Sequence, residues 1–419
     1  MRSSPRWIQT LPLLTLALAG CAQESQVGQQ TQGIFGGVND TIHTNVVGIV
    51  IQSGGGLGTC TGSLIARNLV LTARHCVSEI SGEAIVCSRF TQDGMTYEPS
   101  TAAAPYNPGG LLVTTDSVIT QSSRFVRVAE VMIPPDSTGV PMCGKDIALL
   151  RLSSYITEVP LIRPRLDVAS FINEAFTASG YGAINGRGGG SGTRRMRAGL
   201  AVEHVGLAQA RPGLTVVAAE EFLANTGTCQ GDSGGPALDE LNEVFGILSR
   251  GSATSCDSPI YTRVDSYAAW IRAQAQRSAM IGSYAAPDWV TPPVAAEGAI
   301  GDLCQSDIQC AAPSRCLPIG GGVRGCTTND CTACPENFVC NDTSTHCVRD
   351  PSTIPPPAPD AGPEAGPAPD AGMTGPDGGV TTPMMTGGCS VHGTGPGTLA
   401  PLVAALAMLA SRRRARRVS

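Results

Sequence analysis

The sequence predicts an all-β fold, a sandwich or a barrel, and three observations support this class. First, 51 glycines and 31 prolines among 419 residues supply many turns. Second, 42% hydrophobic residues with only 15% charged residues can fill a core, which argues against a coiled coil and against a wholly disordered chain. Third, short apolar runs separated by Gly, Ser, Asn and Pro recur between residues 34 and 277. They include residues 46–51, 68–72, 146–152, 214–219 and 244–249.

The end of this region has helical periodicity. Tyr267, Trp270 and Ile271 lie at helical spacing, which predicts a helix from Asp265 to about Gln276. Asp265 is placed to cap its first turn. We therefore expect a β-rich domain that ends in one helix.

Residues 1–20 have the features of a secretory signal. A charged start precedes an apolar run over residues 7–19, which is too short to span a membrane. The sequence Leu-Ala-Gly-Cys at residues 18–21 resembles a bacterial lipobox, which predicts a lipid on Cys21 and attachment to a membrane. The alternative is ordinary cleavage nearby, for example after Ala22, which leaves no lipid.

Composition limits the compartment and the partners. Sixteen cysteines indicate an oxidising compartment, and together with the signal they predict a secreted or cell-surface protein of the outer envelope. The net charge is −6 and no basic domain is present. Nucleic acid is therefore not expected as a partner, because phosphate contacts need clustered Lys and Arg.

The densest chemical signal is Ser233, which lies in the sequence Gly-Asp-Ser-Gly-Gly-Pro at residues 231–236. The glycines let the backbone turn sharply and expose the hydroxyl. A bare Gly-x-Ser-x-Gly also fits the α/β-hydrolase elbow, but that fold has its catalytic histidine after the serine. Here His75 and Asp146 precede Ser233, and the order His, Asp, Ser suits a two-barrel serine protease.

Residues 34–277 resemble the trypsin/chymotrypsin family of serine proteases. The resemblance implies two six-stranded antiparallel β-barrels with the site between them, followed by a C-terminal helix. His43 and His204 stand outside the matching motifs, and we expect both to be surface or structural residues. The motifs, in the family's order, are Ile34-Phe35-Gly36-Gly37, Thr72-Ala73-Arg74-His75-Cys76, Asp146-Ile147-Ala148-Leu149-Leu150, residues 231–236, and Tyr261-Thr262-Arg263-Val264.

The resemblance also implies hydrolysis of peptide bonds by a Ser-His-Asp triad. His75 takes the proton of the Ser233 hydroxyl and later passes it to the leaving amine. Asp146 holds the imidazole in one tautomer. The backbone N–H groups of Gly231 and Ser233 form the oxyanion hole. We expect protein or peptide substrates, and no metal ion or other cofactor.

Three disulfides are expected in this region. By the resemblance, one bridge lies beside the histidine loop and another beside the specificity pocket, and two further cysteines remain to form the third. The expected pairs are Cys60–Cys76, Cys229–Cys256 and Cys87–Cys143.

Activation in the family joins a freshly cut amino terminus to the aspartate beside the nucleophile. Here the partners are Ile34 and Asp232. The residue before Ile34 is Gly33 rather than Lys or Arg. Cleavage at this position therefore needs a protease that accepts small residues.

The resemblance places Gly227 at the base of the specificity pocket, where a trypsin-like enzyme has an aspartate. Thr228, Ser249 and Gly251 complete the pocket and the substrate-binding edge, without a charge. We therefore expect cleavage after uncharged residues. Arg250 stands where the family usually has tryptophan, which departs from the pattern.

The tail contains a connector at residues 278–300 and eight cysteines within residues 301–350, which predict a small disulfide-stapled module. The spacing of Cys331 and Cys334 leaves zinc binding as an alternative. Residues 351–388, rich in Pro, Gly, Ala and Asp, predict a disordered, extended linker.

The last segment, residues 389–419, begins at Cys389 and continues with an apolar stretch and five arginines. It resembles a myxobacterial-type carboxy-terminal sorting signal, which implies cleavage and anchoring near Cys389. The alternative is a weak membrane helix that stays in place.

Two functions from different classes follow from the sequence. The first is a secreted or surface-anchored serine endopeptidase. The second is a catalytically silent protein that uses the protease fold for adhesion or binding. The presence of His75, Asp146, Ser233 and Gly231 favours the first, whereas the unusual Gly33 supports the second.

Overall fold

The structure is a computed structural model that describes residues 34–353, except 35–36, 54–55, 83–84, 93–94, 184–190, 210–215, 253–255, 329–330, 332–333 and 342–345. The expected signal peptide, linker and sorting signal, with Cys21 and Cys389, lie outside the described residues, as does residue 33. None of the helices in the described part of the chain is long and apolar enough to cross a membrane.

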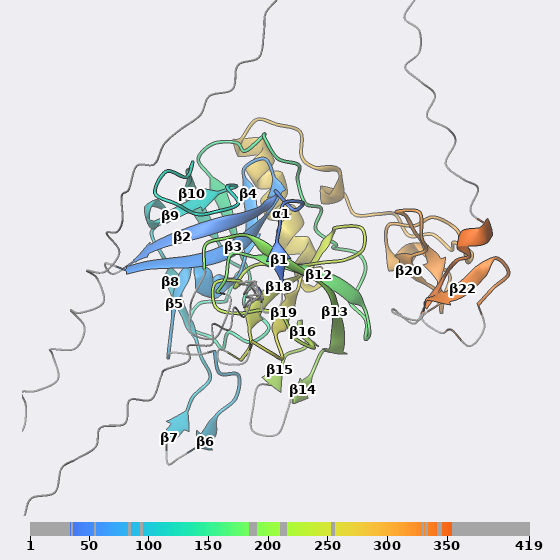
Figure 1. The fold of residues 1–419 in the computed structure, drawn as a ribbon, viewed down its shortest axis with the longest axis horizontal. Coiled ribbons are helices and arrows are strands. Elements are labelled where there is room, and N and C mark those ends of the chain that lie inside the picture. The colour runs from blue at the N-terminus through green and yellow to red at the C-terminus, as the bar shows by residue number, and fades with distance from the viewer. Residues whose placement is uncertain are drawn as a thin grey trace, which may run out of the picture. The chain divides into compact units, whose positions relative to one another are not determined.

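The first half of the protease-like region forms a closed antiparallel barrel with strand order β10-β11-β4-β3-β2-β9 (Figure 1). Its Val, Ile and Leu side chains fill one continuous core. Strand β4 is buried on both faces, because the barrel interior lies on one side and other segments cover the other. The six strands are β2 (Val46–Ser53), β3 (Gly56–Ala66), β4 (Leu69–Thr72), β9 (Leu111–Thr114), β10 (Val126–Met132) and β11 (Ala148–Leu152).

Two small hairpins extend from this half. They pair β5 with β8 and β6 with β7, and these four strands, which lie between β4 and β9, are called the surface insertion below. Their bounds are β5 (Ser78–Ile80), β6 (Phe90–Gln92), β7 (Met95–Tyr97) and β8 (Ala102–Pro105).

The second half forms another six-stranded antiparallel barrel, which closes where β13 pairs with β16. Stacked Phe222, Phe245 and Tyr261 rings fill its centre. The predicted fold class is confirmed. The strands are β12 (Ala175–Gly180), β13 (Arg195–Val205), β16 (Glu221–Ala224), β17 (Pro236–Leu238), β18 (Val244–Arg250) and β19 (Ile260–Arg263), with β1 (Val38–Asn39) added beside β13 and a separate hairpin of β14 (Ala208–Gln209) and β15 (Val216–Val217).

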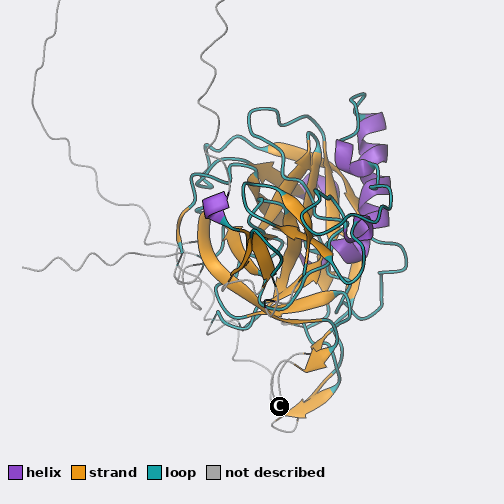
Figure 2. Ribbon diagram, turned by 90° about the vertical axis from the view of Figure 1, so that its right-hand side faces the viewer, coloured by secondary structure: helices purple, strands orange, loops and turns teal. Residues whose placement is uncertain are grey.

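The helix is α1 (Ala268–Ile281), which covers one side of the strands (Figure 2). Ile271 and Ala275 pack into the core of the first barrel. A 3-10 turn, η3 (Asp265–Tyr267), precedes the helix, so the predicted cap is wrong. Asp265 instead pairs with the guanidinium of Arg263, which competes for its carboxylate.

The expected connector is part of the packed protein. Helix α1 crosses the boundary expected at residue 277, and the 3-10 turn η4 (Asp288–Val290) follows it. Trp289 is buried in the core of the first barrel, and its carbonyl accepts a hydrogen bond from Arg272 at 3.1 Å. The chain therefore stays on the protease-like region until it reaches the cysteine-rich module.

The cysteine-rich module consists of two hairpins, β20 (Arg315–Pro318) with β21 (Arg324–Thr327) and β22 (Phe338–Asn341) with β23 (His346–Arg349). Short 3-10 turns, η5 (Asp307–Gln309) and η7 (Pro351–Thr353), flank them. The zinc alternative is wrong, because both cysteines that suggested it are in disulfides. The four bridges are Cys304–Cys316, Cys310–Cys326, Cys331–Cys340 and Cys334–Cys347.

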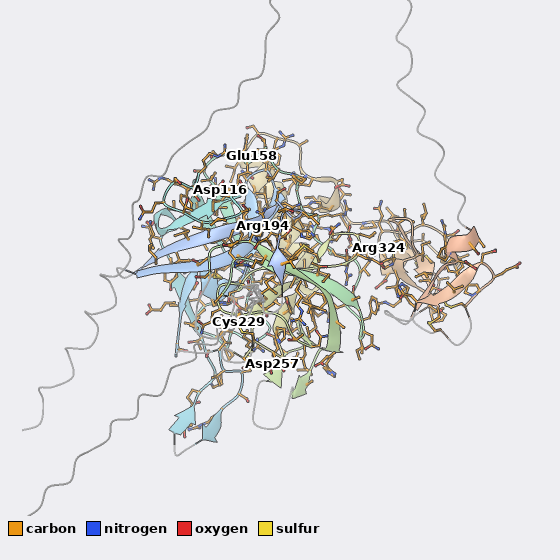
Figure 3. The ribbon with its side chains drawn as sticks, in the orientation of Figure 1. Asp116, Glu158, Arg194, Cys229, Asp257 and Arg324 are labelled. Carbon is orange, nitrogen blue, oxygen red and sulfur yellow. A yellow bond between two sulfur atoms is a disulfide. The ribbon has the colours of Figure 1, made fainter. Side chains whose placement is uncertain are left out.

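Arg324 of the module is buried against the second barrel (Figure 3). Its guanidinium pairs with the carboxylates of Asp239 and Glu243, the latter at 2.8 Å. Arg165 contacts the same oxygen of Asp239, Oδ2, at 3.1 Å and also pairs with Glu174. A buried charge is expensive unless it is paired, so this arrangement holds the module in one position on the barrel.

We expect Arg324→Met in the full chain to lower the free energy of unfolding by about 3 kcal/mol, because it leaves buried carboxylates with one cation fewer. Urea denaturation measures the change. The control is Arg89→Met, which removes an ion pair with Glu98 whose side chains are 70% and 62% exposed. That control should change stability by less than about 0.5 kcal/mol. Equal, small effects of the two substitutions would show that the Arg324 contact does not hold the module.

Candidate active site

His75 and Asp146 form a hydrogen-bonded pair. His75 lies on the 3-10 turn η1 (Arg74–Cys76), directly after β4. Its backbone N–H donates to Asp146 Oδ1 at 2.9 Å, and its Nδ1 lies 2.8 Å from Asp146 Oδ2. Because an ionised carboxylate only accepts, Nδ1 carries the proton and Nε2 of the neutral ring is the acceptor. The imidazole is therefore oriented with its basic nitrogen away from Asp146.

The carboxylate of Asp146 is fully buried and remains ionised. The Ser249 hydroxyl donates to Asp146 Oδ2 at 2.7 Å. Burial raises the pKa of Asp146, but the charge and hydrogen bonds of His75 and the bond from Ser249 bring that pKa below its usual value. An ionised Asp146 can hold the imidazole and stabilise it when it takes a proton.

Ser233 lies on the turn before β17, and its peptide is fixed to the first barrel. The Thr61 N–H donates to the Ser233 carbonyl at 2.8 Å, and the Thr61 hydroxyl donates to the Gly231 carbonyl at 2.9 Å. Cys76 Sγ lies 3.5 Å from the Ser233 carbonyl oxygen and 4.0 Å from His75 Nε2. The turn that carries the serine is thus next to the basic nitrogen of the imidazole.

The Ser233 hydroxyl itself is not hydrogen-bonded to His75 within the described residues. Such contacts are often long in proteins without substrate and shorten in the complex. The structure therefore brings His75 and Asp146 into direct contact and brings Ser233 beside them.

The backbone around Ser233 offers two donors. Across the described part of the chain, the N–H groups of Gly231 and Ser233 donate to no protein acceptor, and both residues are half-buried. Gly231 has φ +95°, and a Cβ there would lie 2.9 Å from Gly182 Cα. At Gly234 a Cβ would lie 2.2 Å from the hydroxyl of Thr72. The glycines thus allow the two barrels to approach and leave these N–H groups available to an anion.

Asp232 points away from the solvent into the second barrel and is almost fully buried. Its carboxylate accepts the N–H of Gly182 at 2.7 Å and that of Cys229 at 2.9 Å. Burial raises the pKa of Asp232 to about 7, although these two bonds and the charge of Arg195 act in the opposite direction. Ile34 is fully buried in the second core. Among the described residues, no hydrogen bond joins Ile34 to the Asp232 carboxylate.

Gly227 is enclosed by β13. A Cβ at Gly227 would lie 2.9 Å from Leu200 Cδ2 and 3.5 Å from Arg197 Cδ. Thr228 and Ser249 are buried, whereas Gly251 is exposed. The expected base of the pocket therefore carries no acidic side chain of its own and lies near a basic residue.

Disulfides connect the loops of this region. Cys60–Cys76 joins β3 to the histidine turn with a Cα–Cα distance of 6.1 Å. Cys229–Cys256 joins the two segments beside the expected pocket, with 4.9 Å between Cα atoms. Cys87–Cys143 links the surface insertion to the loop that precedes Asp146.

Arg74 is a residue whose role sequence reasoning missed. Its side chain is buried beside His75 and donates to the hydroxyls of Ser78 and Ser137 at 2.8 and 2.7 Å. It also donates to the Ala103 carbonyl at 2.8 Å. The available signal was its position directly before His75. Arg74 fixes the histidine turn to the surface insertion.

His43 is a structural residue and His204 is half-buried on β13. His43 Nδ1 lies 2.9 Å from the buried carboxylate of Asp40, which also accepts the Ser179 hydroxyl at 2.6 Å. Asn242 contacts the other ring nitrogen at 3.2 Å. This cluster fixes the segment that follows Ile34 to β12.

Two antiparallel barrels with a hydrogen-bonded His-Asp pair and a serine turn at their junction define the class of two-barrel serine proteases. The family model described as Trypsin matches residues 34–271. The chain belongs to the trypsin family.

Individual relatives are similar at a modest level. The chain is 27% identical to chymotrypsin-like elastase family member 1 of Rattus norvegicus, over 53% of this chain and 80% of that protein. It is 26% identical to trypsin alpha-4 of Lucilia cuprina, over 64% of this chain and 96% of that protein. It is also 28% identical to a trypsin-like protease of Streptomyces glaucescens, over 50% of this chain and 72% of that protein.

Proposed function

We propose that this protein is an active serine endopeptidase that hydrolyses peptide bonds with Ser233 as nucleophile. The observation that carries the proposal is the His75–Asp146 pair, at 2.8 Å, beside the turn that bears Ser233. Membership of the trypsin family supports it, as do relatives whose names describe proteases. Protein or peptide chains are the proposed substrates.

The proposed mechanism assigns a role to each group of the site. Nε2 of His75 accepts the proton of the Ser233 hydroxyl as its oxygen attacks the carbonyl carbon, and the tetrahedral oxyanion faces the N–H groups of Gly231 and Ser233. His75 then gives its proton to the leaving amine. Asp146 stays ionised and stabilises the imidazolium. Water attacks the acyl-enzyme by the same sequence and releases the second product.

The proposed compartment, outside the cytoplasm, rests on the disulfide bonds. The seven disulfides among the described residues are the bonds of an exported protein, and trypsin-like proteases with many disulfides are typically extracellular. We further propose a lipid at Cys21 and sorting at Cys389, which rest on the sequence alone.

We expect a fluorophosphonate probe to label the wild-type chain, once it is cut before Ile34, on Ser233. Only a hydroxyl activated by a neighbouring base reacts at a useful rate. Gel fluorescence and mass spectrometry locate the label, and Ser233→Ala is the matched control. An absence of labelling in the cut, folded protein would favour the alternative function, adhesion or binding without catalysis.

The proposed side-chain preference is for uncharged residues before the scissile bond. Gly227 has no side chain and so supplies no carboxylate to the expected base of the pocket. A cationic substrate side chain would find no carboxylate at that position, and burying a charge without a partner is costly. This argument opposes a preference for Lys or Arg.

Profiling with a peptide library should show cleavage mainly after apolar or small residues. Cleavage by the wild-type enzyme mainly after Lys or Arg would contradict the proposed pocket.

The proposed activation step is cleavage before Ile34, which creates an ammonium group for Asp232. In the uncut chain the pKa of Asp232 is raised to about 7 by burial. Because this folded-state pKa lies above the usual value of 3.8, the uncut fold holds a proton that the unfolded chain loses between these pH values. The free energy of unfolding therefore falls as pH rises through this window.

We expect the uncut Ser233→Ala chain to lose on the order of 4 kcal/mol between pH 4 and pH 7 relative to the same chain cut before Ile34. The new ammonium lets Asp232 ionise without that loss. Urea denaturation of both forms across this range measures the difference, and His43, common to both, cancels. Parallel stability curves for the two forms would rule out the Ile34–Asp232 pair.

A further inference from the structure

Glu221, the first residue of β16, is a fully buried carboxylate with four donors. The N–H groups of Gly144 and Ala218 donate to it at 2.7 and 2.8 Å. The guanidinium of Arg250 donates through both terminal nitrogens, at 2.6 and 2.7 Å. This two-bond geometry is available to arginine and not to lysine.

Arg250 also reaches the residue that contacts the active-site carboxylate. Its Nη1 lies 3.2 Å from the oxygen of Ser249, and that hydroxyl lies 2.7 Å from Asp146 Oδ2. A guanidinium has donors and no acceptors. The Ser249 oxygen therefore accepts from Arg250, and its own hydrogen is directed to Asp146. The guanidinium thus determines the direction in which the hydroxyl donates.

The same carboxylate holds the backbone that leads into Asp146. Gly144 is two residues before Asp146 and has φ +78°. Its N–H donates to Glu221, and its carbonyl accepts the hydroxyl of Tyr267. A Cβ at Gly144 would lie 2.5 Å from Glu220 Oε2, so a glycine is needed for this approach. Glu221 therefore connects the loop before Asp146 to the end of β18.

We propose that Glu221 and Arg250 are a pair of positioning residues that fix Asp146, and through it His75, for the reaction. The inference rests on the proposed endopeptidase function. Arg250 occupies the place where the related family usually has tryptophan, so this charged network belongs to this chain rather than to the family pattern.

The charge of Glu221 is as important as its hydrogen bonds. An uncompensated guanidinium beside Ser249 would attract Asp146 and weaken its contact with His75. The side chains of Arg250 and Glu221 are only 6% and 0% exposed, so solvent screens this attraction poorly. The carboxylate of Glu221 compensates the charge of the guanidinium, which can then orient the Ser249 hydroxyl without attracting Asp146.

The test uses the full chain, cut before Ile34, with Glu221→Gln, Arg250→Gln and the double variant. We expect each single substitution to lower kcat at least ten-fold on a peptide substrate while KM changes less than two-fold. The kcat of the double variant should be no lower than that of the less active single variant, because both substitutions remove the same interacting pair. Arg250→Lys should show an intermediate loss, since it keeps the charge without the fork.

Two further measurements separate positioning from general stability. Glu174→Gln, which removes a buried carboxylate that pairs with Arg165 on the module side, is the matched control and should keep kcat within two-fold at a temperature where all variants are folded. Glu221→Gln leaves the Arg250 charge uncompensated near the imidazole. The acid limb of its kcat/KM–pH profile should therefore move to lower pH.

A readout independent of turnover is the low-field proton NMR signal of His75 Nδ1–H in the Ser233→Ala chain. We expect the signal to shift or broaden in Glu221→Gln and not in Glu174→Gln. If the wild-type chain neither hydrolyses peptides nor reacts with the probe, the proposed function fails while this signal still reports on the pair. If wild type is active and the Glu221 and Arg250 variants keep kcat within two-fold with an unchanged signal, the positioning role is overturned.

Discussion

The burial of three carboxylates at the junction of the two barrels is the constraint on which the arrangement of the site depends. Asp146, Glu221 and Asp232 are all almost fully buried. A buried carboxylate needs hydrogen-bond donors, and each of these takes at least one from the backbone of another segment. Loops that are far apart in the sequence are therefore tied to one another at fixed distances. Removing any of these acceptors would leave buried N–H groups without a partner.

The sequence-based predictions succeeded where a local pattern carries a local physical requirement. The glycines around Ser233 predicted a sharp backbone turn, and Gly231 and Gly234 have φ +95° and +80°. The short apolar runs predicted an all-β sandwich or barrel, and the family resemblance, carried by the ordered motifs, implied the two barrels. His75 and Asp146 could be singled out because each stands beside a strand-like run and because their order with Ser233 fits a known chemistry.

The predictions failed or were silent where the partner is set by tertiary structure. The helix cap at Asp265 was expected from local preference, but Arg263 competes for that carboxylate. The contacts of Arg74 with Ser137, and of Arg324 with Asp239, join residues more than 60 positions apart. No periodicity or motif encodes such pairs. In each case the sequence shows only an isolated arginine, and the group that it binds becomes known only from the fold.

The three carboxylates differ in how their charge is compensated, and this difference connects stability to function. Asp146 has His75 beside it, and Glu221 has the two-bond contact of Arg250. For Asp232, burial outweighs its two backbone bonds and the charge of Arg195, and its pKa rises to about 7. In the uncut chain Asp232, one residue from Ser233, is therefore the carboxyl group among the three whose burial favours the protonated form. A cation that reaches this position would stabilise the fold and the turn of the proposed oxyanion hole at the same time, so the two cannot be adjusted separately.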